Sequence, residues 1–398
     1  MLKKRLRFSG MEFLFWATLA AGSFNVVFLR GRNLSNTTIG TIMALVACTN
    51  IFAQPLWGIV SDRIRSVKKV CVLCLACSGA VFFLLPFSKT VVLTCVMLMT
   101  FTLFSSPLSP LLDSWVIKGI AGEPRISYGS LRLLGSIGYA IMTFVYGKLI
   151  DSVSINIIFI AYLILALISI LSIVRMESET LTGHRTLKEM KVGRLFRNYY
   201  FAAFVIFAFL IYIPTTASMT YLPNLVEQVG GSREQLGIMF SFRALTEIPV
   251  FLFGGYLIKR FRPERLLIFA GILYSLQQLV YLLSVKPWQA FAGQVLGGPS
   301  YSLFLLGMIH YVYMLAPEEL KSTSQTVAAS FSMGLSSVVA SYAGGLLIDH
   351  AGIYWLYRIG VISNVLMVTL FILSFALGKR VLKQNKSVIG EESQNVQG

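Results

Sequence analysis

The segment YGSLRLLGSIGYAIMTFVYGKLID, from Tyr128 to Asp151, is mostly apolar and long enough to cross a bilayer, yet it carries Arg132 near one end. A guanidinium in hydrocarbon costs roughly 2.5 to 3.5 kcal/mol on insertion scales, so an intramembrane arginine normally faces a wet cavity or a partner. Gly135 and Gly138 allow another helix to approach closely. The segment therefore predicts a membrane helix with a functional arginine. The alternative is that Arg132 lies near the headgroups and snorkels out of the membrane.

The composition of the chain indicates a protein embedded in a bilayer. Of its 398 residues, 56% are hydrophobic and 13% are charged, and the mean hydropathy is +0.73. A soluble globular chain of this length is far less apolar. The net charge of +17 does not indicate nucleic-acid binding, because the basic residues gather in short segments between apolar runs. We therefore expect a multi-pass protein of the cell membrane, surrounded by lipid and monomeric.

The five cysteines all lie within apolar runs and predict no disulfide framework. Cys71, Cys74 and Cys77 superficially resemble a metal-binding pattern, but along a continuous helix their side chains spread around the cylinder instead of converging. We expect small packing residues at these positions, and at Cys48 and Cys95, and neither a metal nor a cofactor.

Twelve apolar runs of membrane-spanning length follow one another along the chain. We predict an all-α membrane protein with a six-helix bundle over residues 1–174, a cytoplasmic linker over 175–198, a second six-helix bundle over 199–378 and a cytoplasmic tail over 379–398. The fourth run contains Pro107 and Pro110 and is expected to be a kinked or tilted span. The runs are Gly10 to Leu29, Thr38 to Val60, Val70 to Phe87, Thr90 to Ile117, Gly129 to Ile150, Ile155 to Val174, Tyr199 to Tyr221, Gln235 to Ile258, Leu266 to Val285, Pro287 to Ala316, Gln325 to Ile348 and Tyr354 to Gly378.

Two short patterns recur at a nearly constant offset in the two halves. One is a glycine followed by charged residues after the second and eighth runs, and the other is a glycine four residues before an aspartate at the ends of the fifth and eleventh. Because six helices return the chain to its starting side, the halves are parallel repeats, and we expect a solute site near mid-membrane between them. The patterns are Gly58-x-x-x-Asp62-Arg63-x-Arg65 with Gly255-x-x-x-Lys259-Arg260-x-Arg262, and Gly147-x-x-x-Asp151 with Gly345-x-x-x-Asp349.

The stretch QPLWGIVSDR, residues 54–63, is similar to the loop signature of the major facilitator superfamily, although Arg65 stands where that signature usually has a second glycine. The resemblance implies two pseudo-symmetric six-helix bundles that rock about a central site. It also implies that Gly58, Asp62 and Arg63 form a gating loop.

Within that superfamily the chain resembles the lactose permease and phenylpropionic acid transporter group, through the pattern GSLRLLGSIGY at 129–139, preceded by Asp113. The resemblance implies that Asp113 and Arg132 bind the substrate and that Tyr139 stacks on it. Asp113 capping the cytoplasmic end of the fourth helix is the alternative. The histidine that this group commonly carries on its tenth helix is missing, because Gln294 to Pro299 occupy that region. The usual proton relay is therefore absent or relocated.

Two further charged groups lie inside apolar runs. Arg243 and Glu247 are one helical turn apart and are predicted to pair on one face. They form either a structural ion pair or the proton-coupling site, in which the carboxylate takes a proton when the pair loosens. Glu12, near the entrance of the first helix, is expected to be an ordinary interfacial charge.

These observations predict a secondary active transporter that moves a small polar or ring-containing solute, such as a sugar, nucleoside or aromatic acid, in symport with a proton. A proton-driven exporter of sugars or drugs is the alternative, because the same two-half architecture runs in either direction. An enzyme is not expected, since the sequence contains no H-E-x-x-H, G-x-S-x-G or G-x-x-x-x-G-K-[ST] motif.

Threading the twelve runs in alternation places roughly 25 of the 34 lysines and arginines on the side of the N-terminus, which the positive-inside rule assigns to the cytoplasm. We predict that both termini and the linker lie there. In a cysteine-free background, cysteines introduced at Ser178 and Ser387 should react with an impermeant thiol reagent only after the cells are permeabilised. Ready labelling of either position in intact cells would contradict the twelve-helix topology.

Overall fold

The computed structural model describes residues 2–120, 128–176, 192–316 and 320–395, with the backbone alone at 2–5, 128, 130, 192–194, 322 and 376–395. These residues contain helices and no strand, and twelve helical segments are long and apolar enough to cross a membrane. The predicted all-α fold with twelve transmembrane helices is confirmed. Residues 177–191 of the predicted linker lie outside the described part of the chain.

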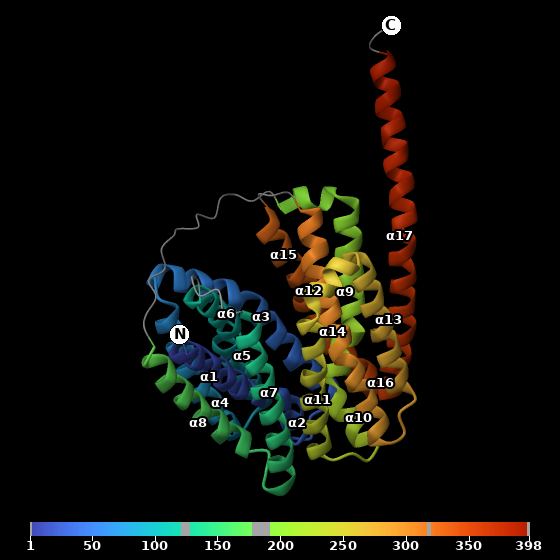
Figure 1. Ribbon diagram of the computed structural model, residues 1–398. Coiled ribbons are helices and arrows are strands. Elements are labelled where there is room, and N and C mark those ends of the chain that lie inside the picture. The colour runs from blue at the N-terminus through green and yellow to red at the C-terminus, as the bar shows by residue number, and fades with distance from the viewer. Residues whose placement is uncertain (1, 121–127, 177–191, 317–319, 396–398) are drawn as a thin grey trace.

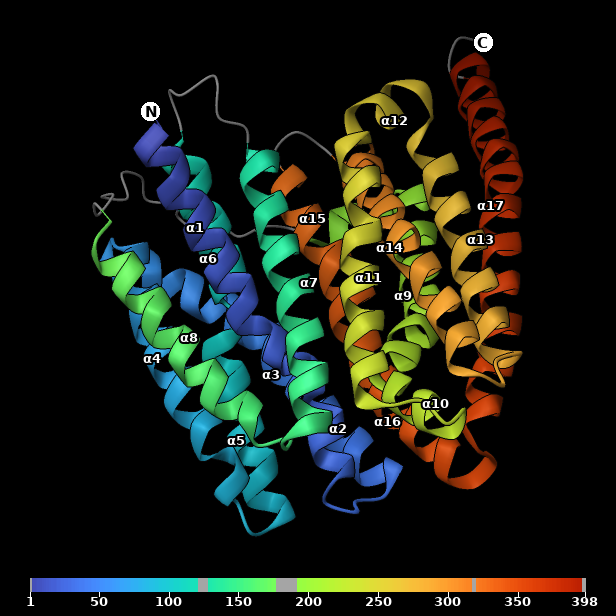
Figure 2. The ribbon, with the colours of Figure 1, turned by 60° about the horizontal axis from the view of Figure 1, so that its bottom comes forward.

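Helices α1 to α8 form one side of the molecule and α9 to α17 the other, and α17 runs on past the bundle (Figures 1 and 2). We call these two sides the N-half and the C-half. The N-half contains α1 (Leu2–Leu19), α2 (Asn25–Arg30), α3 (Asn36–Ile64), α4 (Val67–Leu84), α5 (Val91–Ser105), α6 (Leu108–Gly119), α7 (Tyr128–Ser152) and α8 (Ile157–Val174). The C-half contains α9 (Tyr199–Thr220), α10 (Leu222–Gln228), α11 (Arg233–Leu252), α12 (Gly254–Arg260), α13 (Pro263–Leu282), α14 (Pro287–Leu315), α15 (Lys321–Ala329), α16 (Ser336–Ala351) and α17 (Ile353–Asn395).

Several of the spans are irregular along their length. The fourth divides into α5 and α6 at Pro107, which has no N–H to donate, so the predicted kink is confirmed. The eleventh passes from α15 through a π-helical segment, Ser330–Leu335, into α16. In this segment Gly334 packs against Ile51 of α3. The irregular turn therefore lies where the C-half touches the N-half.

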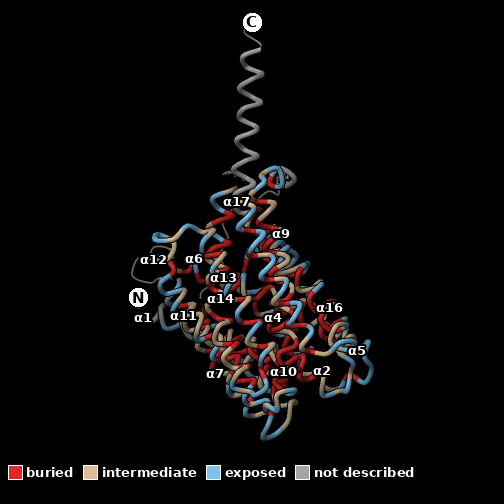
Figure 3. Tube along the Cα trace, turned by 90° about the vertical axis from the view of Figure 1, so that its right-hand side faces the viewer, coloured by how far each residue is buried: buried red, intermediate tan, exposed pale blue. Residues whose placement is uncertain are grey.

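Buried and exposed residues alternate along the helices, so that each helix has a packed side and an open side (Figure 3). Large apolar side chains such as Phe52, Leu171 and Ile362 are exposed. Tyr162 and Phe82, in contrast, are fully buried between helices of the N-half. An apolar outer surface of this extent suits a lipid environment and not water.

The two halves meet along α7 with α11 and along α3 with α16. Glycines permit this contact. A Cβ on Gly237 of α11 would lie 2.8 Å from the Cα atom of Gly147 on α7, and a Cβ on Gly345 of α16 would overlap the backbone carbonyl of Asn36 on α3. Real Cβ atoms do not approach other atoms so closely, so larger residues at these positions would force the halves apart.

Two aspartates complete the same contacts at what we call the distal end, the end opposite the first residues of α1 (Figure 2). Asp349 of α16 accepts hydrogen bonds from the backbone N–H groups of Asn36 and the next residue, at 3.1 and 2.6 Å. Asp151 of α7 accepts hydrogen bonds from the backbone N–H groups of Arg233 and the next residue, at 3.3 and 2.7 Å. Such groups lack a partner within their own helix, and the helix dipole favours an anion beside them. Each half therefore caps a helix of the other.

The opposite, proximal end of α3 differs from the sequence prediction. The helix continues through Gly58, Asp62 and Arg63 to Ile64, so the expected gating loop is helical at these residues. The turn into α4 is made by Arg65, whose φ of 53° lies in the left-handed region. A residue with a Cβ is strained there by roughly 1–2 kcal/mol, which explains why a glycine is common at this point of the signature.

Arg65→Gly should raise the stability of the protein by about 0.5 kcal/mol, because relief of the strain outweighs the entropy that glycine gains in the unfolded chain. Arg63→Gly is the matched control, since it removes the same charge from a helical position two residues earlier. It should lower the stability by about 0.5–1 kcal/mol. Thermal denaturation of the purified protein in detergent measures both, and a loss of stability in Arg65→Gly would contradict the strain.

Candidate functional site

Arg132 of α7 lies over the indole ring of Trp16 on α1, with the guanidinium carbon 3.9 Å from the ring centroid. Helices α1 and α7 are in close contact because Gly135 meets the same Trp16 and Gly138 meets the backbone of Phe13, which confirms the close approach predicted for these glycines. A cation over an indole face is attracted by the ring quadrupole. The half-buried side chain of Arg132 therefore packs against α1 within the N-half.

In the C-half, Arg243 and Glu247 of α11 form the predicted ion pair, with Nε 3.8 Å from Oε1 and the side chains 15% and 19% exposed. The ring of Tyr301 on α14 lies next to the same guanidinium, 5.9 Å from its carbon. Helix α14 comes this close because Gly298 has no Cβ, which would overlap the hydroxyl of Thr246. The pair is thus nearly enclosed by protein, with an aromatic ring on one side.

A shell of tyrosines around Arg243 was missed by the sequence analysis. Tyr274 and Tyr281 on α13 are fully buried and interact electrostatically with the guanidinium. The side chain of Gln277 donates a hydrogen bond to the Tyr281 hydroxyl at 2.9 Å. The signal was present in the sequence, since these three residues recur at helical spacing on one face of an otherwise apolar run.

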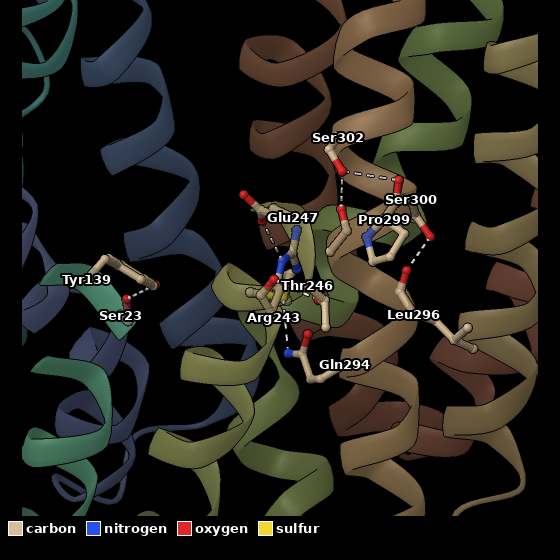
Figure 4. A network of polar contacts seen from close by, with 12 residues as sticks. Ser23, Tyr139, Arg243, Thr246, Glu247, Gln294, Leu296, Pro299, Ser300 and Ser302 are labelled. Atoms are coloured by element: carbon tan, nitrogen blue, oxygen red, sulfur yellow. Dashed lines mark hydrogen bonds and ion pairs between the residues drawn. The ribbon is translucent and has the colours of Figure 1, made fainter. Parts of the chain in front are cut away.

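Tyr139 of α7, in the N-half, lies near the arginine group of the C-half. Its hydroxyl is 2.7 Å from that of Ser23 in the N-half, and Figure 4 shows this pair facing the side on which Arg243 and Glu247 lie. Tyr139 interacts electrostatically with Arg243, and Glu247 in turn interacts with Arg132 of the N-half. Residues that the sequence assigned to two separate functions therefore belong to one charged region between the halves.

Asp113 is half-buried on α6, and Glu12 on α1 is fully buried. Glu12 interacts electrostatically with both Asp113 and Arg132, so it lies beside two of the predicted substrate-binding residues. The prediction that Glu12 is an interfacial charge is wrong. Because α1 is already helical from Leu2, Glu12 lies several turns inside it, on a face covered by neighbouring helices.

The predicted gating residues Gly58, Asp62 and Arg63 lie away from this region, on the proximal turns of α3. Asp62 and Arg63 are exposed, and a Cβ on Gly58 would meet no atom within 4 Å. These three positions therefore lie on the open side of the helix in this conformation, while Trp57 on another side of the same turns packs against Phe104 of α5.

A cavity of about 780 Å³ opens at the distal end between the halves and is separate from the arginine groups. Arg30 and Glu227, an ion pair that joins the two halves, contribute to its lining, together with Asp151 and Arg233. In the part of the chain that the structure describes, no group of three or more histidine, cysteine, aspartate or glutamate side chains is placed to hold a metal ion.

Relatives of known sequence are similar to this chain over most of its length. An uncharacterized transporter, YwbF of Bacillus subtilis, is 26% identical over 96% of this chain and 98% of its own. The maltose permease of Geobacillus stearothermophilus is 27% identical over 85% of this chain and 86% of its own. The sucrose permease of Escherichia coli is 24% identical over 92% of each.

Solved structures share the fold at lower sequence identity. The nucleoside transporter NupG superposes with a TM-score of 0.81 at 15% identity, covering 94% of this chain and 99% of that one. A D-xylose-proton symporter gives a TM-score of 0.69 at 15% identity, covering 91% and 96%. The arrangement of helices is therefore that of the major facilitator fold.

The family described as "MFS_1 like family" matches residues 5–359, which is most of the chain. Together with twelve membrane spans and permease relatives, this match identifies the chain as a multi-pass membrane transporter, and not an enzyme, of the MFS_1-like family within the major facilitator superfamily.

Proposed function

We propose that the protein is a secondary active transporter that takes up a sugar, with maltose and sucrose as the first candidates, in symport with a proton. The observation that carries the proposal is that Arg132 and Arg243, one from each half, lie in one charged region with aromatic rings and carboxylates. The names of two relatives, a maltose permease and a sucrose permease, support the same substrate class.

The residue types of this region suit a polyhydroxylated ring. A guanidinium offers several hydrogen-bond donors in a fixed geometry, and a carboxylate accepts hydrogen bonds from hydroxyl groups. An aromatic face covers the apolar side of a sugar. We assign these roles in the N-half to Arg132, Asp113 and Tyr139. In the C-half, Glu247 takes the coupled proton when its pair with Arg243 loosens.

The distal closure defines where the described conformation stands in a transport cycle. Two helix caps and the Arg30–Glu227 pair hold the halves together at the distal end, around a cavity that does not include the arginine groups, so we propose that solute reaches the charged region from the proximal side. If the termini are cytoplasmic, as the basic residues predict, this is an inward-facing state. We propose that Gly58, Asp62 and Arg63 contact the C-half in the opposite state, when the proximal end closes, and so form its gate.

The proposed activity is tested with the purified protein in liposomes. Radiolabelled maltose, sucrose, a nucleoside and an aromatic acid are offered with and without an acidic exterior. Sugar accumulation that depends on the imposed pH gradient supports proton symport. Uptake restricted to the nucleoside or the acid refutes the sugar assignment, and sugar accumulation that is unaffected by the gradient refutes the coupling.

Arg132→Lys should weaken maltose binding at least about tenfold, because a lysine keeps the charge but loses the fork of fixed donors. Asp113→Asn should also weaken binding of a sugar, because the carboxylate accepts hydrogen bonds from the hydroxyl groups of the sugar. Arg358→Lys is the matched control, since Arg358 also lies over a tryptophan, Trp355 at 5.1 Å, but on the exposed surface of α17. Equilibrium titrations on folded protein provide the measurement, and near-native affinity in Arg132→Lys would place the substrate elsewhere.

Asp151→Asn or Asp349→Asn should shift the conformational equilibrium toward an open distal end. A carboxylate at a helix start contributes about 1 kcal/mol, so its loss changes the equilibrium about fivefold. A cysteine at Val226, which is 2% exposed beside the distal cavity, should react about fivefold faster with an impermeant maleimide in either mutant. Glu234→Gln is the control, because that side chain makes no hydrogen bond or ion pair in the described structure, and an equal acceleration there would refute the capping role.

A further inference from the structure

Glu12 is the most deeply buried acidic side chain of the N-half that the structure describes. Its exposure is 0%, and neither carboxylate oxygen has a hydrogen-bond partner among the described groups. Neither predicted function of the region uses it. An ionised carboxylate in such surroundings is strongly disfavoured, whereas a protonated one is not.

The packing around Glu12 explains its burial. Phe8, Glu12 and Trp16 recur every four residues and form one stripe along α1. At one end of the stripe the ring of Phe8 fills the space left by Gly119 of α6, and at the other Trp16 fills the space left by Gly135 of α7. Glu12 lies between these two contacts. Helices α1, α6 and α7 therefore close around a carboxyl group.

The charged groups that face Glu12 come from two of the helices packed around it. Asp113 of α6 disfavours a second negative charge, and Arg132 of α7 favours one. Helix α8, which also packs on α1, has no charged residue between Ile157 and Val174 and presents Ser169 to Thr18 at 3.4 Å. Burial and Asp113 thus favour the neutral acid, and among the charged groups Arg132 is the one that favours the carboxylate.

In the described conformation Arg132 lies on the Trp16 ring, one helical turn from Glu12. We propose that Glu12 is a proton-binding site of the transport cycle in the N-half, and that Arg132 releases the proton by moving from Trp16 onto the Glu12 carboxylate. This inference rests on the proposed function, because it makes the substrate-binding arginine the link between solute and proton.

The exchange at Glu12 is balanced in protons and charge. A proton from the aqueous phase adds to a carboxylate oxygen and gives the neutral acid. A sugar bound to Arg132 keeps the guanidinium away, so the acid stays protonated. When the sugar leaves, Arg132 pairs with Glu12, the carboxylate re-forms and the proton passes to water on the proximal side. Solute and proton then bind and leave together, which is symport.

The first test uses the full-length protein in liposomes with maltose as the probe. Two quantities are measured, accumulation driven by an acidic exterior and exchange of labelled for unlabelled maltose without a gradient. Glu12→Gln should lower the ratio of accumulation to exchange at least about tenfold, because an amide cannot carry the proton. An unchanged ratio overturns the proposal. Absence of both activities in the unsubstituted protein refutes maltose as the substrate and leaves Glu12 to the second test.

The second test needs no transport. Infrared spectra of the unsubstituted, sugar-free protein should gain the carbonyl stretch of a protonated carboxylic acid, with a shift in D₂O, as the pH is lowered from alkaline to mildly acidic. Glu12→Gln should lose at least about half of the intensity of this band. Glu247→Gln, the matched change in the C-half, should keep the part of the band that Glu12→Gln loses. A band unchanged in Glu12→Gln overturns the proposal. A Glu12→Gln protein that does not fold is replaced by Glu12→Asp, which should keep the band at a shifted frequency, and a band at an unchanged frequency overturns the proposal.

Discussion

The closed distal end depends on a reciprocal arrangement in which each half supplies the anion that completes a helix of the other. Asp349 accepts hydrogen bonds from the first backbone N–H groups of α3, and Asp151 accepts hydrogen bonds from those of α11. Neither aspartate can reach its partner helix unless the backbones almost touch, which the glycines at 147, 237 and 345 allow. These short contacts hold the halves together at one end, and the charged region lies beyond them, toward the proximal end.

That charged region is organised so that neither arginine depends on solute for a partner. Arg243 has Glu247 and the surrounding tyrosines, and Arg132 has the face of Trp16. A buried guanidinium without such neighbours would be strongly destabilising. The aromatic partner of Arg132 is the weaker kind, because it leaves all the N–H donors of the guanidinium available. The two halves therefore differ in how readily their arginines are recruited.

Much of the fold was predictable because membrane helices are specified locally. Twelve apolar runs, the break at Pro107 and the turn that joins Arg243 to Glu247 all follow from neighbours in the sequence. The environment of Glu12 was not predictable in this way. Its burial depends on Gly119 and Gly135 of two other helices, and a charge near a helix start looks interfacial when read alone. The same reason hid the role of the Gly-x-x-x-Asp repeat, whose partners lie in the opposite half.

The two crossed caps also have the form of an isologous contact, the kind found in a homodimer with twofold symmetry. If a single six-helix unit carried an aspartate at the end of its fifth helix and a glycine near the start of its second, two copies would bind each other through both positions at once. The N-half and C-half retain both positions as Asp151 with α11 and Asp349 with α3. The contact thus gives the two halves of one polypeptide the pseudo-twofold relation that two subunits have across a symmetric dimer interface.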